Sequence, residues 1–198
     1  MTQPLEHNPL VQQRSAQIAQ LPGQLRWFGD PVLRGVATPF SPDEIERGEA
    51  KALADELASV LGYIRQQTGL GRAIAAPQIG VLRRMFVAYN PQTDGFDTYV
   101  NPVVASASQT QGIYREMCLS GIPLSGAVVR PWEIEIEYTD LAGSSLKQTL
   151  DPIRSRVSQH EIDHLDGILF IDRAEAKSLA FDFDWATLRE RNSLRKLE

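Results

Sequence analysis

The segment at residues 158–167, SQHEIDHLDG, constrains the fold more than any other part of the chain. Residues four apart lie on the same face of an α-helix, so His160 and His164 can bind one metal ion, with Glu161 beside them as a base. The chain contains three histidines, and two of them fall at this spacing around a glutamate. The pattern therefore favours a metal site over two unrelated histidines.

The helix that carries this motif is predicted over residues 153–165, ending near Gly167. Ile153 and Val157 continue the histidine stripe upstream at steps of three and four residues, as in an amphipathic helix. This pattern indicates that both histidines lie on the buried side of the helix, so the ion would sit between the helix and the core.

A catalytic metal site needs a third protein ligand, and several residues are candidates. A third histidine six residues after the second is excluded, because Phe170 stands there. Glu175 and Glu190 follow downstream, but neither lies in a second helical metal-binding pattern. Cys118 is the remaining soft ligand, about 40 residues upstream, and would leave a fourth tetrahedral position for water. Such a set suits zinc or ferrous iron better than magnesium or calcium.

Composition limits the remaining classes of protein. With 198 residues and 42% hydrophobic content, the chain is expected to form a single domain at residues 25–198, after a polar extension at residues 1–24. A net charge of −5 argues against direct nucleic-acid binding. No apolar run reaches the ~20 residues of a membrane span. One cysteine and the absence of a secretory signal indicate a reducing compartment, the cytoplasm.

The pattern of elements predicts an α+β fold, because the strands cluster instead of alternating with helices. Antiparallel strands should pack around the metal-binding helix, with an N-terminal and a C-terminal helix. Residues 132–140 alternate strictly, with isoleucines on one face and glutamates on the other, as in a half-buried strand. Besides the metal-binding helix, the predicted helices cover residues 11–21, 41–71 and 175–195. The last of these has Phe181, Trp185 and Leu188 on one side. The predicted strands cover residues 84–90, 98–104, 132–140 and 145–151.

Three segments together resemble the motifs of the peptide deformylase family. Residues 71–80, GRAIAAPQIG, are similar to its glutamine motif. Residues 116–120, EMCLS, resemble its cysteine motif, and residues 159–167 resemble its HExxH motif. The resemblance extends over roughly residues 25–175, and the order of the three motifs makes it specific.

The resemblance implies a metal-dependent hydrolase that removes the N-formyl group from formylmethionyl peptides of nascent proteins and releases formate. Cys118, His160 and His164 would hold one divalent ion. The resemblance favours Fe²⁺, which Zn²⁺ or Ni²⁺ would be able to replace. Its implied partners are formylmethionyl peptides and the ribosome exit region; the oligomeric state stays open. A related metal-dependent amidase or peptidase and a non-catalytic binding protein are the alternatives.

Catalytic roles also follow from the resemblance. Glu161 would accept a proton from water and return it to the leaving amine. The Gln78 amide and the Leu119 backbone N–H would stabilise the oxyanion. Without the resemblance, Gln78 beside a proline could be a residue of a surface turn, and Leu119 a residue of the core.

The substrate cleft is where the sequence departs from the family. Arg72, Ala73, Met117 and Val157 are expected to line it, and Ala73 and Met117 stand where the family usually has glycine. Added side chains there are expected to narrow the cleft in which the peptide docks as an extra strand. After the Cys-Leu-Ser triplet, Gly121 takes the place of the family's usual apolar residue.

Two charged residues near the motifs have open roles. Glu116 either orients the cysteine loop or is solvated. Arg130 either holds a segment on the substrate side or pairs with one of the glutamates at positions 133–137.

Overall fold

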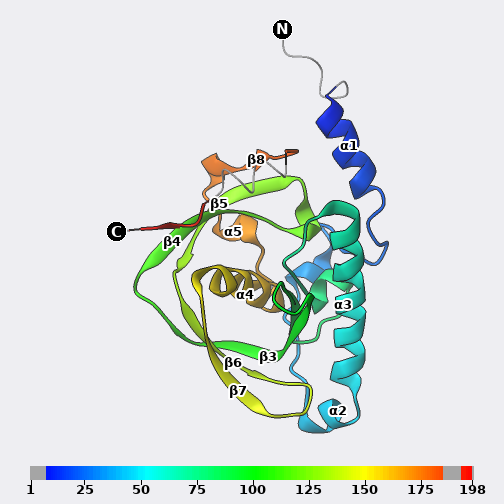
Figure 1. The fold of residues 1–198 in the computed structure, drawn as a ribbon, viewed down its shortest axis with the longest axis vertical. Coiled ribbons are helices and arrows are strands. Elements are labelled where there is room, and N and C mark those ends of the chain that lie inside the picture. Colours follow the sequence, from blue (N-terminus) through cyan, green and yellow to red (C-terminus); the bar gives the residue numbers. More distant parts are fainter. Residues whose placement is uncertain (1–7, 185–192, 198) are drawn as a thin grey trace.

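A computed structural model describes residues 8–184 and 193–197. Two antiparallel sheets enclose the helix α4 (Pro152–Leu165), as Figure 1 shows. This arrangement confirms the predicted α+β class. In the described residues, no helix is both long and apolar enough to cross a membrane.

The larger sheet has five strands in the order β1-β2-β3-β6-β7. All its neighbours pair antiparallel, so successive side chains point to opposite faces. The four predicted strands all lie in this sheet, and the prediction is confirmed. Its members are β1 (Ala73–Ala75), β2 (Met85–Asn90), β3 (Gly95–Ala107), β6 (Ile134–Thr139) and β7 (Ser145–Leu150).

The smaller sheet has the order β8-β5-β4-β9, so β4 and β5 form its centre. The outer strands are short and come from the C-terminal part of the chain. These strands were not predicted from the sequence. They are β4 (Gln111–Met117), β5 (Leu124–Pro131), β8 (Ala180–Phe181) and β9 (Arg195–Lys196).

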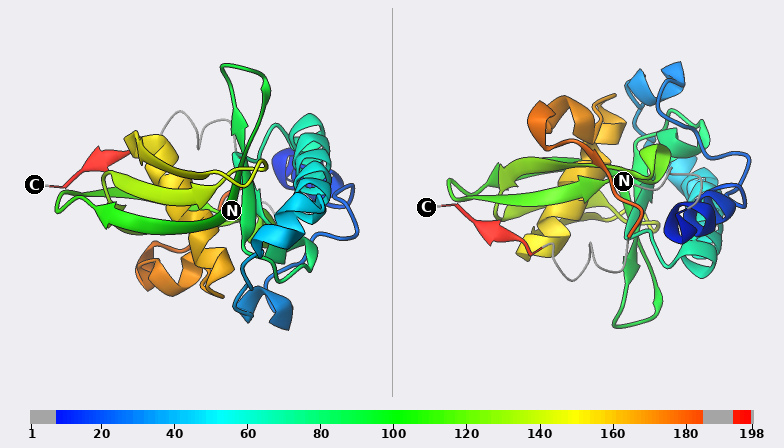
Figure 2. Two further views of the ribbon diagram at one scale, coloured as in Figure 1. Left: turned by 90° about the horizontal axis from the view of Figure 1, so that it is seen from below. Right: turned by 90° about the horizontal axis from the view of Figure 1, so that it is seen from above.

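The helices lie on both sides of the larger sheet. Figure 2 shows α3 (Glu49–Thr68) and α4 on opposite sides of its strands. The N-terminal helix α1 (Pro9–Ile18) matches the short helix expected near residues 11–21, and Gln17 Nε2 ties it to the Gln67 carbonyl at 3.0 Å. The other helical segments are α2 (Pro42–Glu46), α5 (Phe170–Arg173), and the 3₁₀ turns η2 (Pro31–Arg34), η3 (Ala76–Ile79), η4 (Leu119–Gly121) and η5 (Ala176–Ser178).

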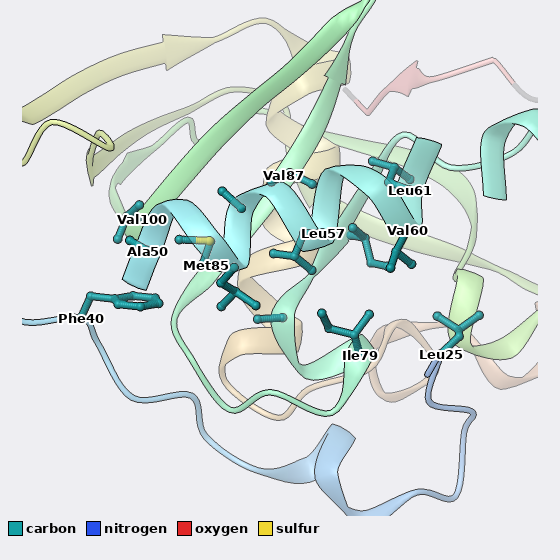
Figure 3. Packing of buried hydrophobic residues seen from close by; sticks show 14 of the residues in the cluster. Leu25, Phe40, Ala50, Leu57, Val60, Leu61, Ile79, Met85, Val87 and Val100 are labelled. Carbon is teal, nitrogen blue, oxygen red and sulfur yellow. The ribbon is translucent and has the colours of Figure 1, made fainter. Parts of the chain in front are cut away.

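Strand β2 lies between two of the three clusters that make up the hydrophobic core. Met85 and Val87 pack in the cluster that contains α3, where Leu57 and Leu61 are fully buried (Figure 3). Phe86, on the opposite face, belongs to the cluster that contains Ile162 of α4. A fully buried side chain of this size stabilises the fold by about 1.5–3 kcal/mol, so both faces hold the sheet against a helix.

Two helix predictions need correction. The helix expected over residues 41–71 is two helices, α2 and α3, because Gly48 between them adopts a left-handed φ of +82°. The C-terminal helix expected over residues 175–195 is absent from the described part of that range. There, residues 176–178 form a 3₁₀ turn and Phe181 lies in β8, while Trp185 and Leu188 lie outside the described residues.

Candidate metal centre and its cavity

Helix α4 positions the histidine motif, and its local sequence explains where it starts. Asp151 caps the helix, because its Oδ1 accepts hydrogen bonds from the Ile153 and Arg154 backbone N–H groups at 3.0 and 3.1 Å. Pro152 occupies the first helical position, where no N–H is needed. The helix ends at Leu165, so the prediction over residues 153–165 is confirmed to within one residue.

Cys118 meets the two histidines of α4 at the end of β4. One ligand atom from each of Cys118, His160 and His164 lies within 4.8 Å of the others. The distance from Cys118 Sγ to His164 Nε2 is 3.2 Å, and both residues are 1% exposed. Among the residues described, these three form the one group of at least three metal-ligating side chains at this spacing.

The donor set fits a soft or borderline divalent cation. A thiol and two imidazoles suit Zn²⁺ or Fe²⁺, and three protein ligands leave one tetrahedral position open. Buried polar atoms normally have a hydrogen-bond partner, yet His164 Nδ1 and Glu161 Oε2 have none among the described residues. The concentration of unsatisfied polar atoms at this point is consistent with a ligand-binding centre.

Glu116 fixes the orientation of His160. Its Oε2 lies 2.9 Å from His160 Nδ1, and Arg130 donates to both of its carboxylate oxygens at 2.7 and 3.0 Å. Burial alone would raise the pKa of Glu116, but Arg130 and the hydrogen bond with His160 outweigh it and hold that pKa well below its usual range. A charged carboxylate beside Nδ1 favours a proton on that nitrogen, which leaves Nε2 as the nitrogen available for a metal.

The structure decides the two open roles in this network. Glu116 is 5% exposed, so it orients His160 and is not solvated. Arg130 does not pair with the strand glutamates at 133–137; besides Glu116, it donates to Asp163 at 2.6 Å. Arg156 is a second arginine at this carboxylate and donates to Glu116 at 2.6 Å.

Asp163 and Arg156 were missed by the sequence reasoning. Both lie in the predicted helix, but a charged residue on a helix normally faces water, and only the tertiary partners explain their burial. Arg173 joins the network by donating to both oxygens of Asp163 at 2.6 Å.

Glu161 lies next to the candidate ligands, and its side chain is buried. It is 4% exposed, and burial raises the pKa of its carboxyl to about 7. A carboxyl with a pKa near neutrality can both accept and donate a proton under ordinary conditions.

Gln78 is 1% exposed in η3, so the alternative of a surface turn is wrong. Its side-chain carbonyl accepts from the Ala75 N–H at 2.9 Å, which directs the NH₂ group the other way. That NH₂ donates to Ser120 Oγ at 3.1 Å and lies 3.5 Å from Cys118 Sγ. Ser120 was also missed, although it stands within the Cys-Leu-Ser triplet. Leu119 buries its side chain in the core around α3.

A cavity of about 160 Å³ opens beside these residues. It brings together the four residues expected at the substrate cleft: Arg72, Ala73, Met117 and Val157. Ile153, which continues the histidine stripe upstream, also lines it and is 40% exposed. The upstream end of the stripe faces the cavity instead of the core. The cavity also reaches the candidate catalytic and ligand residues Gln78, Cys118, Leu119, His160 and Glu161.

Gly121 has a steric reason to be glycine. A Cβ atom at this position would lie 2.4 Å from Cε2 of Phe28. The Phe28 ring packs against Phe170 at a centroid distance of 5.9 Å. The backbone N–H of Phe28 donates to the Ser120 carbonyl at 2.8 Å. The ring therefore has little room to move, and the turn after Cys118 depends on a small residue.

A buried Cys-His-His set with an adjacent glutamate, open to a cavity in an α+β fold, defines a metal-dependent hydrolase site. The sequence model of the polypeptide deformylase family matches residues 23–179. The chain therefore belongs to the peptide deformylase family, whose members are metallohydrolases that remove the N-formyl group from nascent peptides.

Individual relatives support this assignment. A peptide deformylase of Treponema pallidum is 36% identical over 156 residues, covering 78% of this chain and 89% of the relative. One from Picosynechococcus is 38% identical over 160 residues, covering 78% and 80%.

Solved structures have the same fold. The crystal structure of peptide deformylase from Thermotoga maritima aligns with a TM-score of 0.67 and 30% identity, covering 76% of this chain and 96% of that one. A class I type b peptide deformylase from Acinetobacter baumannii, bound to Met-Ala-Ser, aligns with a TM-score of 0.66 and 28% identity, covering 77% and 97%.

Proposed function

We propose that this chain hydrolyses the formamide bond of N-formylmethionyl peptides and releases formate and a free amino terminus. The observation that carries the proposal is that Cys118, His160, Glu161 and Gln78 all border one cavity. The Acinetobacter relative bound to Met-Ala-Ser supports it, because that tripeptide begins with methionine. We place the reaction in the cytoplasm, on nascent chains at the ribosome exit.

Cys118, His160 and His164 are the proposed holders of one divalent ion. Fe²⁺ is the ion that the resemblance favours, with Zn²⁺ and Ni²⁺ as replacements, and the thiol and imidazole donors are compatible with all three. When bound, such an ion polarises a carbonyl and makes a water molecule more acidic.

Glu161 is the proposed proton carrier. As a water oxygen adds to the formyl carbon, Glu161 takes the proton that the water loses, and its Oε2 has no competing partner in the described residues. When the C–N bond breaks, the same carboxyl gives that proton to the leaving nitrogen. A pKa of about 7 suits both halves of this exchange.

Two donors are proposed for the oxyanion that forms on the formyl oxygen. The Gln78 side-chain carbonyl accepts from the Ala75 N–H and its NH₂ group donates to Ser120 Oγ, so the amide is oriented before substrate arrives. The Leu119 backbone N–H is the second. Losing one such donor typically raises the barrier by about 3 kcal/mol.

The peptide is proposed to dock as an extended strand between the two sheets. β1 is the edge strand of the larger sheet, and β4 belongs to the smaller one. Ala73 of β1 and Met117 of β4 both line the cavity, so a peptide lying there has a strand on each side. Arg72 and Val157 complete the proposed substrate contacts.

A second candidate is the hydrolysis of another N-acyl group on the same scaffold. It is favoured by Ala73 and Met117, which add side chains to the cavity wall. A purely structural metal role is disfavoured, because such a site closes its fourth position with a protein ligand.

The decisive experiment is steady-state hydrolysis of formyl-Met-Ala-Ser by protein purified anaerobically with Fe²⁺ or Ni²⁺. We expect turnover by the wild type and a loss of about 10²–10⁴-fold in Glu161→Gln, with one metal ion retained per chain. Equal inactivity of both proteins while metal is bound would overturn the proposal. Acetyl-Met-Ala-Ser, assayed in parallel, tests the second candidate.

A further inference from the structure

The C-terminal strand β9 pairs with β4, the strand that carries the cavity wall and ends one residue before Cys118. Its partners are Gly112 and Ile113, and the Leu197 N–H donates to the Gln111 carbonyl at 2.8 Å. Figure 1 shows the C-terminal strand lying beside β4, and the cavity-lining residues of β4 are the later ones, from Tyr114 to Met117. The first part of β4 therefore pairs with the C-terminal tail, and the last part of β4 lines the cavity.

The tail occupies the edge of β4 that is not paired with β5. β5 runs along the whole of β4, from Gln111 to Met117, on the other edge. A strand has two edges, so a peptide that pairs with β4 beside Met117 must use the same edge as β9. Residues 193 and 194 are described and form no strand, so the pairing with β9 begins at Ile113.

Gly112 makes this docking of the tail possible. A Cβ atom at this position would lie 2.6 Å from the Trp132 ring and 3.2 Å from the Arg195 carbonyl oxygen. A side chain at residue 112 would therefore press on the Trp132 ring and crowd the backbone of the tail. Lys196 of the tail also lies over the Trp132 ring, with its Nζ 5.9 Å from the ring centre.

We propose that β9 sets the length of peptide that the β4 edge can bind. From Met117 to Ile113 the strand advances four residues, roughly 13 Å at about 3.3 Å per residue. A peptide that runs along this edge away from the metal centre meets Arg195 after about four residues. Only the first few residues of the substrate therefore pair with β4, and the residues beyond them make no strand contact. This inference rests on the proposed function.

The alternation of antiparallel pairing supplies a matched set of variants. The Leu197 N–H points toward β4, so the Arg195 N–H, two residues earlier, does too, and the Lys196 N–H points away. Proline removes an N–H donor. The double variant Arg195→Pro/Leu197→Pro should therefore release the tail, whereas Lys196→Pro keeps the pairing bonds and is the control.

The test compares kcat/KM for a formylated tripeptide with that for a formylated octapeptide of the same first three residues. For the wild type and Lys196→Pro we expect nearly equal values, because about one residue beyond the tripeptide can pair before Arg195 is met. For the double variant we expect the octapeptide to gain about three- to tenfold over the tripeptide, because one or two further backbone hydrogen bonds can form. The gain should appear in KM and not in kcat.

The outcomes separate the two proposals. If no protein turns over the tripeptide, the proposed function fails. If the tripeptide is hydrolysed but the ratio of the two kcat/KM values is the same in the wild type, the double variant and the control, the proposal that β9 limits the bound peptide is wrong. A gain in the Lys196→Pro control equal to that of the double variant would also overturn it. Equal melting temperatures and metal content establish that the variants are folded.

Discussion

The carboxylate of Glu116 lies 2.9 Å from Nδ1 of His160, and both side chains are held inside the protein between β4 and α4. This one contact determines which nitrogen of the imidazole faces the metal centre. Arg130 and Arg156 keep the carboxylate charged by donating to it. The metal centre is thus built on an ion-pair network, which the hydrophobic core surrounds.

Replacing Glu116 with glutamine should weaken metal binding. The amide no longer holds the Nδ1 proton as a charged acceptor, and loss of such a partner typically costs 10–100-fold in metal affinity. Competition with a chromogenic chelator measures the change. Glu133→Gln, at an exposed residue immediately before β6, is the control and should leave affinity unaltered. Equal affinities in the two variants would contradict the role assigned to Glu116.

Opening the cavity wall should raise activity. The double variant Ala73→Gly/Met117→Gly removes the side chains that stand where the family has glycine, so kcat/KM for formyl-Met-Ala-Ser should rise severalfold. Glycine in a strand also lowers stability by about 0.5–1 kcal/mol. Ala88→Gly is the matched control, because Ala88 is the residue paired with Ala73 in β2 and is not among the cavity-lining residues. Unchanged kinetics in the double variant would mean that these side chains do not restrict the substrate.

Enlarging Gly121 should destabilise the turn after Cys118. Gly121→Ala places a methyl group against the Phe28 ring, and such overpacking typically costs about 1–3 kcal/mol, or roughly 2–4 °C in Tm per kcal/mol. Thermal unfolding of the metal-loaded protein measures it. Gly23→Ala, with nothing within 4 Å of the new atom, is the control. Adding Phe28→Leu should restore part of the lost stability, and a failure of both effects would contradict the packing argument.

The ion pair of Glu44 and Arg83 predicts acid sensitivity. Hydrogen bonds from Arg83 and from the Ser41 backbone lower the pKa of Glu44 from 4.5 to about 2. Because the folded-state pKa is depressed, the stabilisation is present above pH 4.5 and is lost as the pH falls toward 2. The Tm of the wild type should exceed that of Glu44→Gln at pH 6, and the difference should vanish near pH 2. Glu46→Gln, an exposed neighbour, should show no such convergence. A difference independent of pH would exclude this explanation.

The sequence was most informative where periodicity and chemistry coincide. The helix that carries His160 and His164 and the alternating strand β6 could both be predicted, because each pattern repeats over several turns or residues. The strands β4 and β5 could not. Glu116 and Arg130 interrupt their apolar pattern with buried charges, and these charges make sense only once the two strands face α4.

Other features depended on tertiary contacts that no local pattern records. The break at Gly48 divides a long amphipathic stretch, and the helical periodicity continues across it. The C-terminal segment around Phe181 has helical spacing, yet it pairs with β5 because a free strand edge is available there. The candidate third ligand, Cys118, was found through its chemistry, since it is the one thiol in the chain.

That thiol lies 46 positions from His164, with the strands β5, β6 and β7 between them. An ion bound to both residues would act as a cross-link and would close this stretch into a loop, which restricts the unfolded chain as a disulfide does. Oxidation of the same sulfur atom would open the cross-link and end catalysis together. Oxidation at this one sulfur atom would therefore lower both the stability and the activity of the protein.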